Sequence, residues 1–311
     1  MTSPTEALLP SGHAPEGEAK PGAAIDDTAV TGRGRLVLKR FAQQKRGLFG
    51  LLLVVLLILL AFVGPHFSKW SYTDHDFENF LTAPSKLHWF GTDQTGLDLF
   101  AATMRGAQKS ILIGLLVAVF ATGLAAIVGS AAGYFGGWTD RILMWIVDLL
   151  LVVPSFLIIA IMSGSFAGNW ILFVALLAAF IWQITARIVR GQTLALKERE
   201  YVMAARYMGV PQWKIILNHI LPNLSSLLII DATINVSTAI ILEASLSFFG
   251  FGVQPPDISL GTLLNDGQNA AFTYPWLFLF PAVFLILLVL AVNLVGDALR
   301  DALDPSAGKA Q

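Results

Sequence analysis

The 311-residue sequence contains no cysteine, and only 13% of its residues are charged. The lack of cysteine excludes disulfides, thiolate catalysis and cysteine metal sites, and it leaves the compartment open. Charged residues make up roughly 25% of an ordinary soluble domain, whereas here 55% of the residues are hydrophobic and the mean hydropathy is +0.68. These values exclude a soluble globular protein and favour a protein of the lipid bilayer.

Motifs of several enzyme classes are also missing. No GxxxxGK[ST] phosphate loop occurs, so the chain itself is not predicted to bind ATP. HExxH and GxSxG are absent, and the histidines show no metal-ligand spacing; they are His13, His66, His75, His88 and His219. A membrane enzyme therefore has no support, and we expect no metal site or cofactor in this chain. A net charge of −1 provides no global field for nucleic acid.

Six segments reach the length of about 20 mainly apolar residues that a membrane helix needs. We expect helices at residues 48–67, 108–134, 139–163, 170–190, 220–249 and 274–297. They predict an all-α integral membrane protein whose single six-helix domain covers residues 48–297. Pro154 is expected to kink the third helix. We recognise no internal repeat and no broken helix, the features typical of secondary transporters.

The two ends of the chain are polar. Residues 1–31 are rich in proline, glycine, alanine, serine and acids, which predicts a disordered cytoplasmic tail. Residues 32–47 interleave six basic residues with Leu36, Leu38 and Phe41, which fits an amphipathic helix on the cytoplasmic membrane face or a basic anchor without helical order. Residues 298–311 are expected to form a cytoplasmic tail.

The distribution of lysine and arginine predicts the orientation. With the N-terminus in the cytoplasm, that side holds seven of these residues before the first helix, one at Arg141, six from Arg187 to Lys214 and two after the last helix, sixteen of the 20. The four on the outer side are Lys69, Lys86, Arg105 and Lys109. The positive-inside rule therefore favours two cytoplasmic termini.

Polar residues interrupt two of the expected helices. Asp231, Asn235 and Thr238 recur at i, i+4 and i+7, so they share one face of the fifth helix, and Glu243 lies further along. A charge in hydrocarbon is costly, so these groups should face protein or a water-filled path. They either line a substrate pathway or form hydrogen bonds that only pack the helices. Gly129 and Gly133, at GxxxG spacing, predict close helix packing.

The segment 191–219 is a polar, partly basic interruption between the fourth and fifth helices. Its centre, EYVMAARYMGVPQWKIILNHILP from Glu200 to Pro222, predicts a short helix with small side chains that ends at Gly209. Large apolar groups on such a segment usually indicate a partner interface, or they pack at the lipid headgroups; they are Tyr201, Tyr207, Met208 and Trp213.

Four stretches together resemble a known family. Ala204-Ala205-xxx-Gly209 followed by Ile220-Leu221-Pro222 looks like the EAA loop of permease subunits in bacterial ATP-binding-cassette (ABC) importers. Residues 88–109, residues 243–264 and the ending GDALRDALDP at 296–305 resemble segments of the peptide permeases. The order of the four is similar to that in DppC/OppC-type subunits of dipeptide and oligopeptide importers, which have the type I ABC importer permease fold.

The resemblance implies a set of partners. They are a second, homologous DppB/OppB-like permease subunit, two cytoplasmic ATPase domains that hold ATP and Mg, an external substrate-binding protein and the lipid of a bacterial cytoplasmic (inner) membrane. This chain would bind no cofactor, catalyse no reaction and form half of the translocation pathway. The residues expected to couple it to the ATPase are Tyr201, Ala204, Ala205, Arg206, Gly209, Trp213 and Lys214, and those expected along the pathway are Asp231, Asn235, Thr238 and Glu243.

Two positions depart from the family pattern. Met203 stands where the family has Glu, although Glu198 and Glu200 lie just upstream, and Leu97 precedes Asp98 where an Arg is common. Permeases for nickel, glutathione and haem resemble those for peptides, so the substrate stays open between these classes. A self-contained channel or facilitator is the alternative from a different class.

Overall fold

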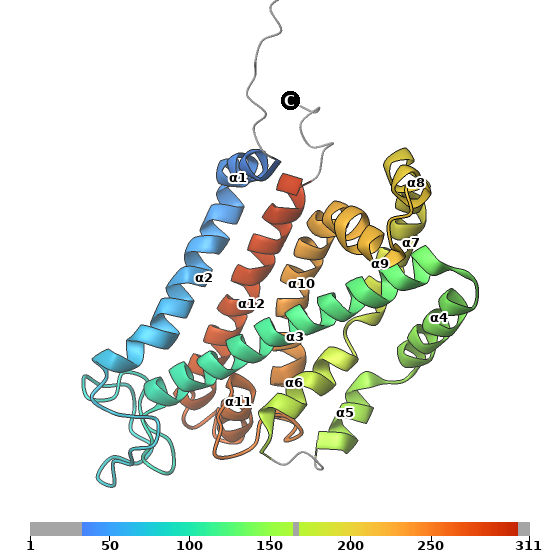
Figure 1. Ribbon diagram of the computed structural model, residues 1–311. Helices are drawn as coiled ribbons and strands as arrows, with labels where there is room; N and C mark the ends of the chain where they lie inside the picture. Colours follow the sequence, from blue (N-terminus) through green and yellow to red (C-terminus); the bar gives the residue numbers. More distant parts are fainter. Residues whose placement is uncertain (1–32, 164–167, 304–311) are drawn as a thin grey trace, which may run out of the picture.

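The chain folds into a bundle of helices (Figure 1). The computed structural model describes residues 33–163 and 168–303, and these contain no strand, only isolated β-bridges between His75 and Leu97 and between Thr92 and Asp98. The all-α fold class is confirmed. The helices are α1 (Arg33–Gln43), α2 (Lys45–Val63), η1 (Gly64–Phe67), α3 (Leu99–Phe135), α4 (Gly137–Val152), α5 (Ser155–Ser163), α6 (Trp170–Ala179), α7 (Gln183–Lys197), α8 (Glu200–Tyr207), α9 (Gln212–Ile215), the π-helical η3 (Ile216–Ile220), α10 (Leu221–Phe248), α11 (Leu260–Gln268) and α12 (Trp276–Leu303).

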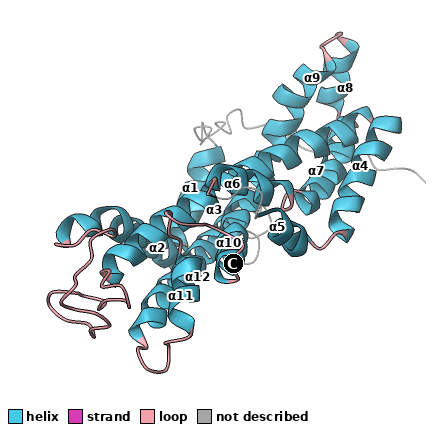
Figure 2. Ribbon diagram, turned by 90° about the horizontal axis from the view of Figure 1, so that it is seen from below, coloured by secondary structure: helices cyan, strands magenta, loops and turns pink. Residues whose placement is uncertain are grey.

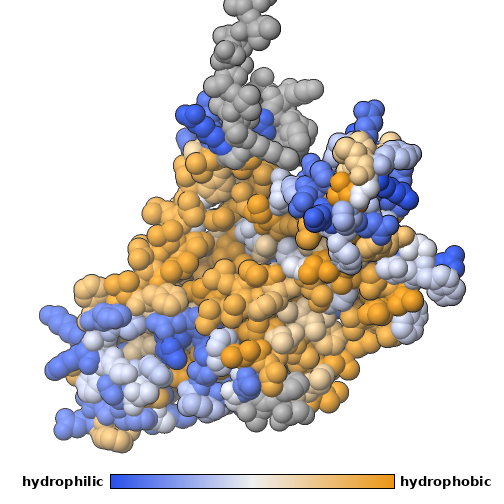
Figure 3. Space-filling model, viewed as in Figure 1, coloured by the Kyte–Doolittle hydropathy of each residue, from blue (hydrophilic) through white to orange (hydrophobic). Residues whose placement is uncertain are grey.

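Four helical stretches are long and apolar enough to cross a bilayer alone: Lys45–Phe67, Leu99–Phe135, Gln212–Phe248 and Trp276–Leu303. Two further helix pairs, α4 with α5 and α6 with α7, pass the same test together but are bent. If each bent pair is one passage, the total is the predicted six. Figure 3 shows the apolar surface across the middle of the bundle, with hydrophilic surface gathered at its two ends.

The two bent pairs have different local causes. The axes of α4 and α5 differ by 79°, because Pro154 forces Val153 out of the helical region to ψ 127°; the expected kink is a full break. The axes of α6 and α7 differ by 47°, where a continuous helix over 170–190 was expected. There the indole of Trp182 donates to the carbonyl oxygen of Ala179 at 2.9 Å, which satisfies an acceptor that the break leaves free. The expectation of unbroken helices was therefore wrong.

Three helices are longer than predicted. Helix α3 begins at Leu99 rather than at residue 108, because the Asp98 carboxylate accepts a hydrogen bond from the Ala101 N–H at 2.8 Å and caps the helix. The fifth span begins at Gln212 rather than at residue 220. The last helix continues to Leu303, so residues 298–303 of the predicted tail are helical, with Ala298 and Ala302 buried.

Different elements form the two ends of the bundle. Helix α1, helix α8 and the C-terminal end of α12 lie at one end, whereas α11 and the irregular segment 68–98 lie at the other (Figures 1 and 2). Residues 32–47 contain the helix α1, followed by a break at Gln44. The predicted tail 1–31 and residues 304–311 lie outside the described residues.

Glycines bring α3 and α7 into backbone contact. A methyl group added to Gly129 would lie 2.5 Å from the carbonyl oxygen of Ala186, and one added to Gly133 would lie 2.8 Å from that of Arg190. The predicted use of this GxxxG pair in close packing is confirmed. This close contact joins α3 to α7, the helix that precedes α8.

Candidate functional site

Local chemistry sets the bounds of α8. Arg199 has extended backbone (φ −73°, ψ 143°) just before the helix, and Gly209 adopts φ +77° just after it, a conformation that favours glycine. The N–H of Gly209 donates to the Arg206 carbonyl at 3.0 Å and that of Val210 to the Ala205 carbonyl at 3.1 Å. This pair of bonds is a Schellman motif, so the predicted helix and its end at Gly209 are confirmed.

Helix α8 has a buried face and an exposed face. Val202 and Ala205 are 2% and 1% exposed and pack with Val189, Ile215 and Ile220 in one apolar cluster. Ala205 therefore holds α8 against its own chain. The remaining residues expected to couple to an ATPase are all exposed: Tyr201, Ala204, Arg206, Gly209, Trp213 and Lys214. Among the large apolar side chains of α8 and α9, Tyr207 and Met208 are the most exposed, at 88% and 76%.

A cavity of about 640 Å³ lies between the end of α3 and α8. Met203, the residue at the family's Glu position, lines it together with Tyr134 and Arg206. Trp213 closes against the end of α3, where its ring centroid lies 5.1 Å from that of Phe135. The segment 191–219 is therefore mostly helical: it holds the end of α7, the short helices α8 and α9 and most of η3, and Trp213 packs on the end of α3.

Helix α8 is firmly connected to the membrane helices. Only Glu198 and Arg199 separate it from α7. Arg190 of α7 donates two hydrogen bonds to Asp140 of α4, at 2.5 and 2.6 Å, and the Lys197 ammonium donates to the carbonyl oxygen of Gly133 in α3 at 3.2 Å. These contacts link α8, through α7, to both α3 and α4.

Asp231 joins three membrane helices. Its carboxylate accepts hydrogen bonds from Thr185 of α7 at 2.6 Å, Thr122 of α3 at 3.0 Å and Asn235 of α10 at 2.8 Å. Asn235 is 7% exposed and also donates to Thr122 at 3.2 Å. We call Asp231, Asn235, Thr122 and Thr185 the Asp231 cluster; its hydrogen bonds link α3, α7 and α10.

Glu243 is part of a second, separate network. Its side chain is fully buried and accepts hydrogen bonds from Ser110 and Ser247, both at 2.7 Å. The Ser110 hydroxyl in turn accepts from the Leu260 N–H at 3.3 Å, and the Ser247 hydroxyl accepts from the Val253 N–H at 3.1 Å. Glu243 thus anchors the start of α11 and the preceding loop to α3 and α10.

The structure separates the four polar residues of the expected pathway. Asp231 and Asn235 belong to one cluster and Glu243 to another, while Thr238 is exposed and donates to the Ile234 carbonyl of its own helix at 3.1 Å. The sequence analysis missed Thr122, Thr185 and Ser110, whose only signal is a hydroxyl within an apolar run. In residues 33–163 and 168–303, no group of three metal-binding side chains comes together.

The chain matches two family models. Residues 121–309 match the binding-protein-dependent transport system inner membrane component, and residues 32–84 match the N-terminal transmembrane domain of oligopeptide transport permease C. The first match alone covers more than half of the chain.

Named relatives agree with these models. The chain is 52% identical over 282 residues to the oligopeptide transport system permease protein OppC of Mycobacterium tuberculosis, with 90% of this chain and 97% of that protein covered. It is 42% identical over 272 residues to OppC of Bacillus subtilis (87% and 88% covered) and 39% identical over 284 residues to a putative peptide permease of Brucella suis (90% and 93% covered). This chain belongs to the family of binding-protein-dependent transport system inner membrane components.

Proposed function

We propose that this chain is one of two membrane subunits of an ATP-driven importer of di- or oligopeptides. The observation that carries the proposal is helix α8, which presents Tyr207 and Met208 to solvent while α7 ties it to the membrane helices. Exposed aromatic and methionine side chains are typical of protein interfaces. The names of the relatives support a peptide substrate.

The partners in this proposal supply what the chain lacks. Two cytoplasmic ATPase domains hold ATP and Mg and receive α8, a second homologous permease completes the pathway, and an external binding protein delivers the substrate. Arg206 and Lys214 are exposed on the same segment and are suited to carboxylates of the ATPase. No cofactor is bound by this chain.

The proposed setting is a bacterial cytoplasmic membrane with both termini inside. Two observations support it: the basic residues favour this side, and α1, α8 and the end of α12 lie together at one end of the bundle (Figure 1). In the mechanism, closure of the ATPases displaces α8, and α7 carries the displacement into α3 and α4. The breaks at Pro154 and at Phe180 let the cytoplasmic halves of the bent pairs move relative to α5 and α6.

Uptake of a labelled tripeptide into proteoliposomes tests the proposal. The vesicles hold this chain with the second permease and the ATPases, and the binding protein is added outside. The double variant Tyr207→Ala, Met208→Ala should lower ATP-dependent uptake about tenfold or more, the effect of removing an interface hot spot. Trp138→Ala is the matched control, because Trp138 is 76% exposed but lies at the α3–α4 turn.

Two results would contradict the proposal. Uptake that proceeds equally without the ATPases would indicate a self-contained channel or facilitator. ATP-dependent uptake of nickel, glutathione or haem with no uptake of peptide would retain the coupling role of α8 but change the substrate.

A further inference from the structure

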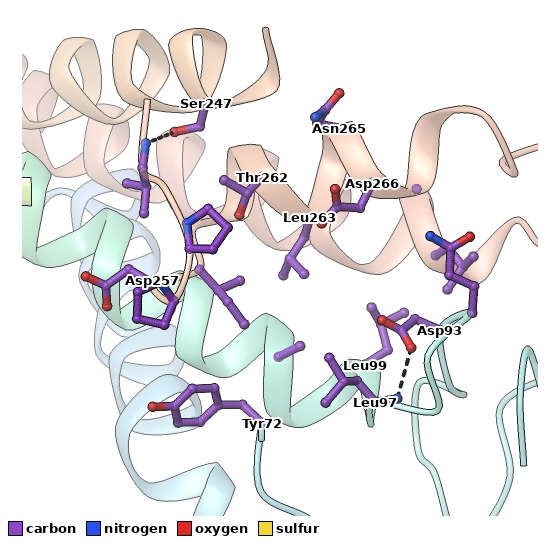
Figure 4. A pocket seen from close by; sticks show the side chains of 18 of the residues that line it. Tyr72, Asp93, Leu97, Leu99, Ser247, Asp257, Thr262, Leu263, Asn265 and Asp266 are labelled. Atoms are coloured by element: carbon purple, nitrogen blue, oxygen red, sulfur yellow. Dashed lines mark hydrogen bonds between the residues drawn. The ribbon is translucent and has the colours of Figure 1, made fainter. Parts of the chain in front are cut away.

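A cavity of about 660 Å³ opens at the end of the bundle opposite α8. Its walls come from the segment 68–98, the first turn of α3, the loop after α10 and the helix α11 (Figure 4). Its volume lies within the roughly 300–1,000 Å³ of small-ligand sites. None of the contacts described for α8 or for the Asp231 cluster involves it.

Hydrogen bonds and close packing hold α11, one wall of the cavity, against its neighbours. Ser259 caps α11 with a reciprocal capping box, and the first N–H of α11 reaches the Ser110 hydroxyl that bonds Glu243. A methyl group added to Gly267 would lie 2.7 Å from the Leu277 carbonyl oxygen, so α11 also packs closely on α12. The α11 wall of the cavity is therefore attached to both α3 and α12.

Most of the cavity wall is apolar, and its unpaired charge lies at one end. Figure 4 shows Asp93 and Asp266 at the end opposite Asp257. Asp257 is neutralised by Lys109 at 2.9 Å and faces Arg105 at 3.9 Å. Within the described part of the chain, neither Asp93 nor Asp266 forms an ion pair with a basic side chain. One oxygen of Asp93 accepts from the N–H groups of Thr95 and Leu97 at 2.7 and 2.9 Å.

The two carboxylates at the acidic end of the cavity repel each other. Partial burial, and then the charge of Asp93, raise the pKa of Asp266. A cation at this end of the cavity would offset the charge that Asp93 exerts on Asp266. The aromatic side chain of Tyr274 also lines the cavity, and aromatic rings attract cations. The leucine side chains of Leu97 and Leu263 offer an apolar surface beside the acidic end.

We propose that this cavity binds a peptide with its amino-terminal ammonium group at the end lined by Asp93 and Asp266 and an apolar side chain against Leu97 and Leu263. The inference rests on the proposed function, since it assigns a peptide contact to the membrane subunit itself. An ammonium group forms charge-assisted hydrogen bonds with a carboxylate, and the apolar wall contacts the side chains of a short peptide.

Binding to the full-length chain in lipid nanodiscs tests the inference. The probes are Leu-Ala-Leu with a free amino terminus and its N-acetylated form, measured by saturation-transfer NMR and calorimetry without the binding protein. The free peptide should bind at least about tenfold more tightly, as expected for one charge-assisted contact. Asp266→Asn should remove this preference and leave the acetylated peptide unaffected.

Two further variants complete the design. Leu97→Arg should abolish binding of both peptides, because it places a cation and a longer side chain in the cavity. Glu78→Gln is the matched control, since it removes an exposed acid of the same segment that does not line the cavity; it should leave both affinities unchanged. Within the described residues, the Asp266 side chain makes no hydrogen bond, so Asp266→Asn should not destabilise the fold. An unchanged unfolding temperature of this variant verifies that it is folded.

Equal binding of the two peptides, or an unchanged affinity in Asp266→Asn, would overturn the inference. A second outcome would also overturn it: the cavity binds no peptide, and Asp266→Asn abolishes salt-sensitive docking of the binding protein. The occupant of the cavity would then be a basic side chain of that protein. ATP-dependent uptake that is lost in the α8 variant but intact in Asp266→Asn would overturn this inference alone and leave the proposed function standing.

Discussion

The Nδ1 atom of His88 lies 2.8 Å from a carboxylate oxygen of Asp98. The Nε2 atom of the same ring lies 3.2 Å from the carboxylate of Asp76. Because a protonated imidazole donates from both nitrogens, the imidazolium form of His88 satisfies both acids. Asp98 also caps α3, so this buried triad joins the segment 68–98 to the start of a membrane helix.

Replacement of His88 should therefore loosen the external segment. His88→Leu removes both donors and leaves two buried carboxylates facing each other, which should cost about 3 kcal/mol or more. The segment 68–98 should become sensitive to limited proteolysis while the helical content stays unchanged. His66→Leu, at an exposed histidine of η1, is the control; equal protease resistance of the two variants would contradict this role of His88.

The lowered pKa of Asp76 determines how the segment 68–98 should respond to acid. Hydrogen bonds from the Asn79 amide, first, and from the Glu78 N–H lower the pKa of Asp76 below its ordinary value of 3.8, with a smaller effect of His88. A carboxyl group whose pKa is lower in the folded than in the unfolded state stabilises the fold at pH values above the unfolded-state pKa. This contribution is lost as the pH falls through the folded-state pKa. The contribution of Asp76 should therefore persist down to about pH 3.8 and vanish below it.

Trp70 reports on this transition, because its ring is stacked 5.0 Å from that of His88. Its fluorescence, measured as the difference from a Trp70→Phe variant, should change only at the acid end of the titration. Asn79→Ala should move the change to higher pH, whereas Asn269→Ala, at an exposed asparagine after α11, should not. An unchanged midpoint in Asn79→Ala would show that Asn79 does not set the pKa of Asp76.

Two glycines of α3 should respond differently to the same substitution. Gly129→Ala puts a methyl group 2.5 Å from the Ala186 carbonyl oxygen, so overpacking should cost about 1–3 kcal/mol. A methyl group at Gly123 has no atom within 4 Å, and Gly123→Ala should be neutral or stabilise by up to about 1 kcal/mol through helix propensity. Thermal unfolding in one detergent compares the two; similar unfolding temperatures would argue against close packing of α3 on α7.

The Asp231 cluster should act through packing. Asp231→Ala leaves Thr122, Thr185 and Asn235 without their shared acceptor and should destabilise the chain by about 1–3 kcal/mol. Thr238→Ala on the exposed face of the same helix should change stability by less than about 0.5 kcal/mol. If Asp231→Asn and Asn235→Ala keep the unfolding temperature but abolish transport, the cluster lines the pathway instead.

Features with a local cause could be predicted from the sequence. The apolar runs predicted six membrane passages because a bilayer tolerates few other segments of that length. Gly209 predicted the end of α8 because the left-handed conformation after a helix favours glycine whatever surrounds it. Pro154 predicted the disruption of the third passage for a similar reason.

Features that depend on residues distant in the sequence could not be predicted from it. The start of α3 at Leu99 depends on its capping by Asp98 and on burial of Phe100 and Met104 against other helices. Helix α11 was missed because its nine residues have too short an apolar pattern, and it is held by Ser110 and Glu243 from elsewhere in the chain.

The sequence by itself determined a membrane permease with a short helix that ends at Gly209, because apolar length, helix caps and family motifs are local patterns. Only the tertiary structure decided which polar groups meet. Asp231 receives donors from 46 and 109 positions away, His88 lies between two acids, and Asp93 and Asp266 share a cavity. Hydrogen bonds and charge pairs act over a few ångströms, and no spacing along a chain reveals which distant residues the fold brings within that range.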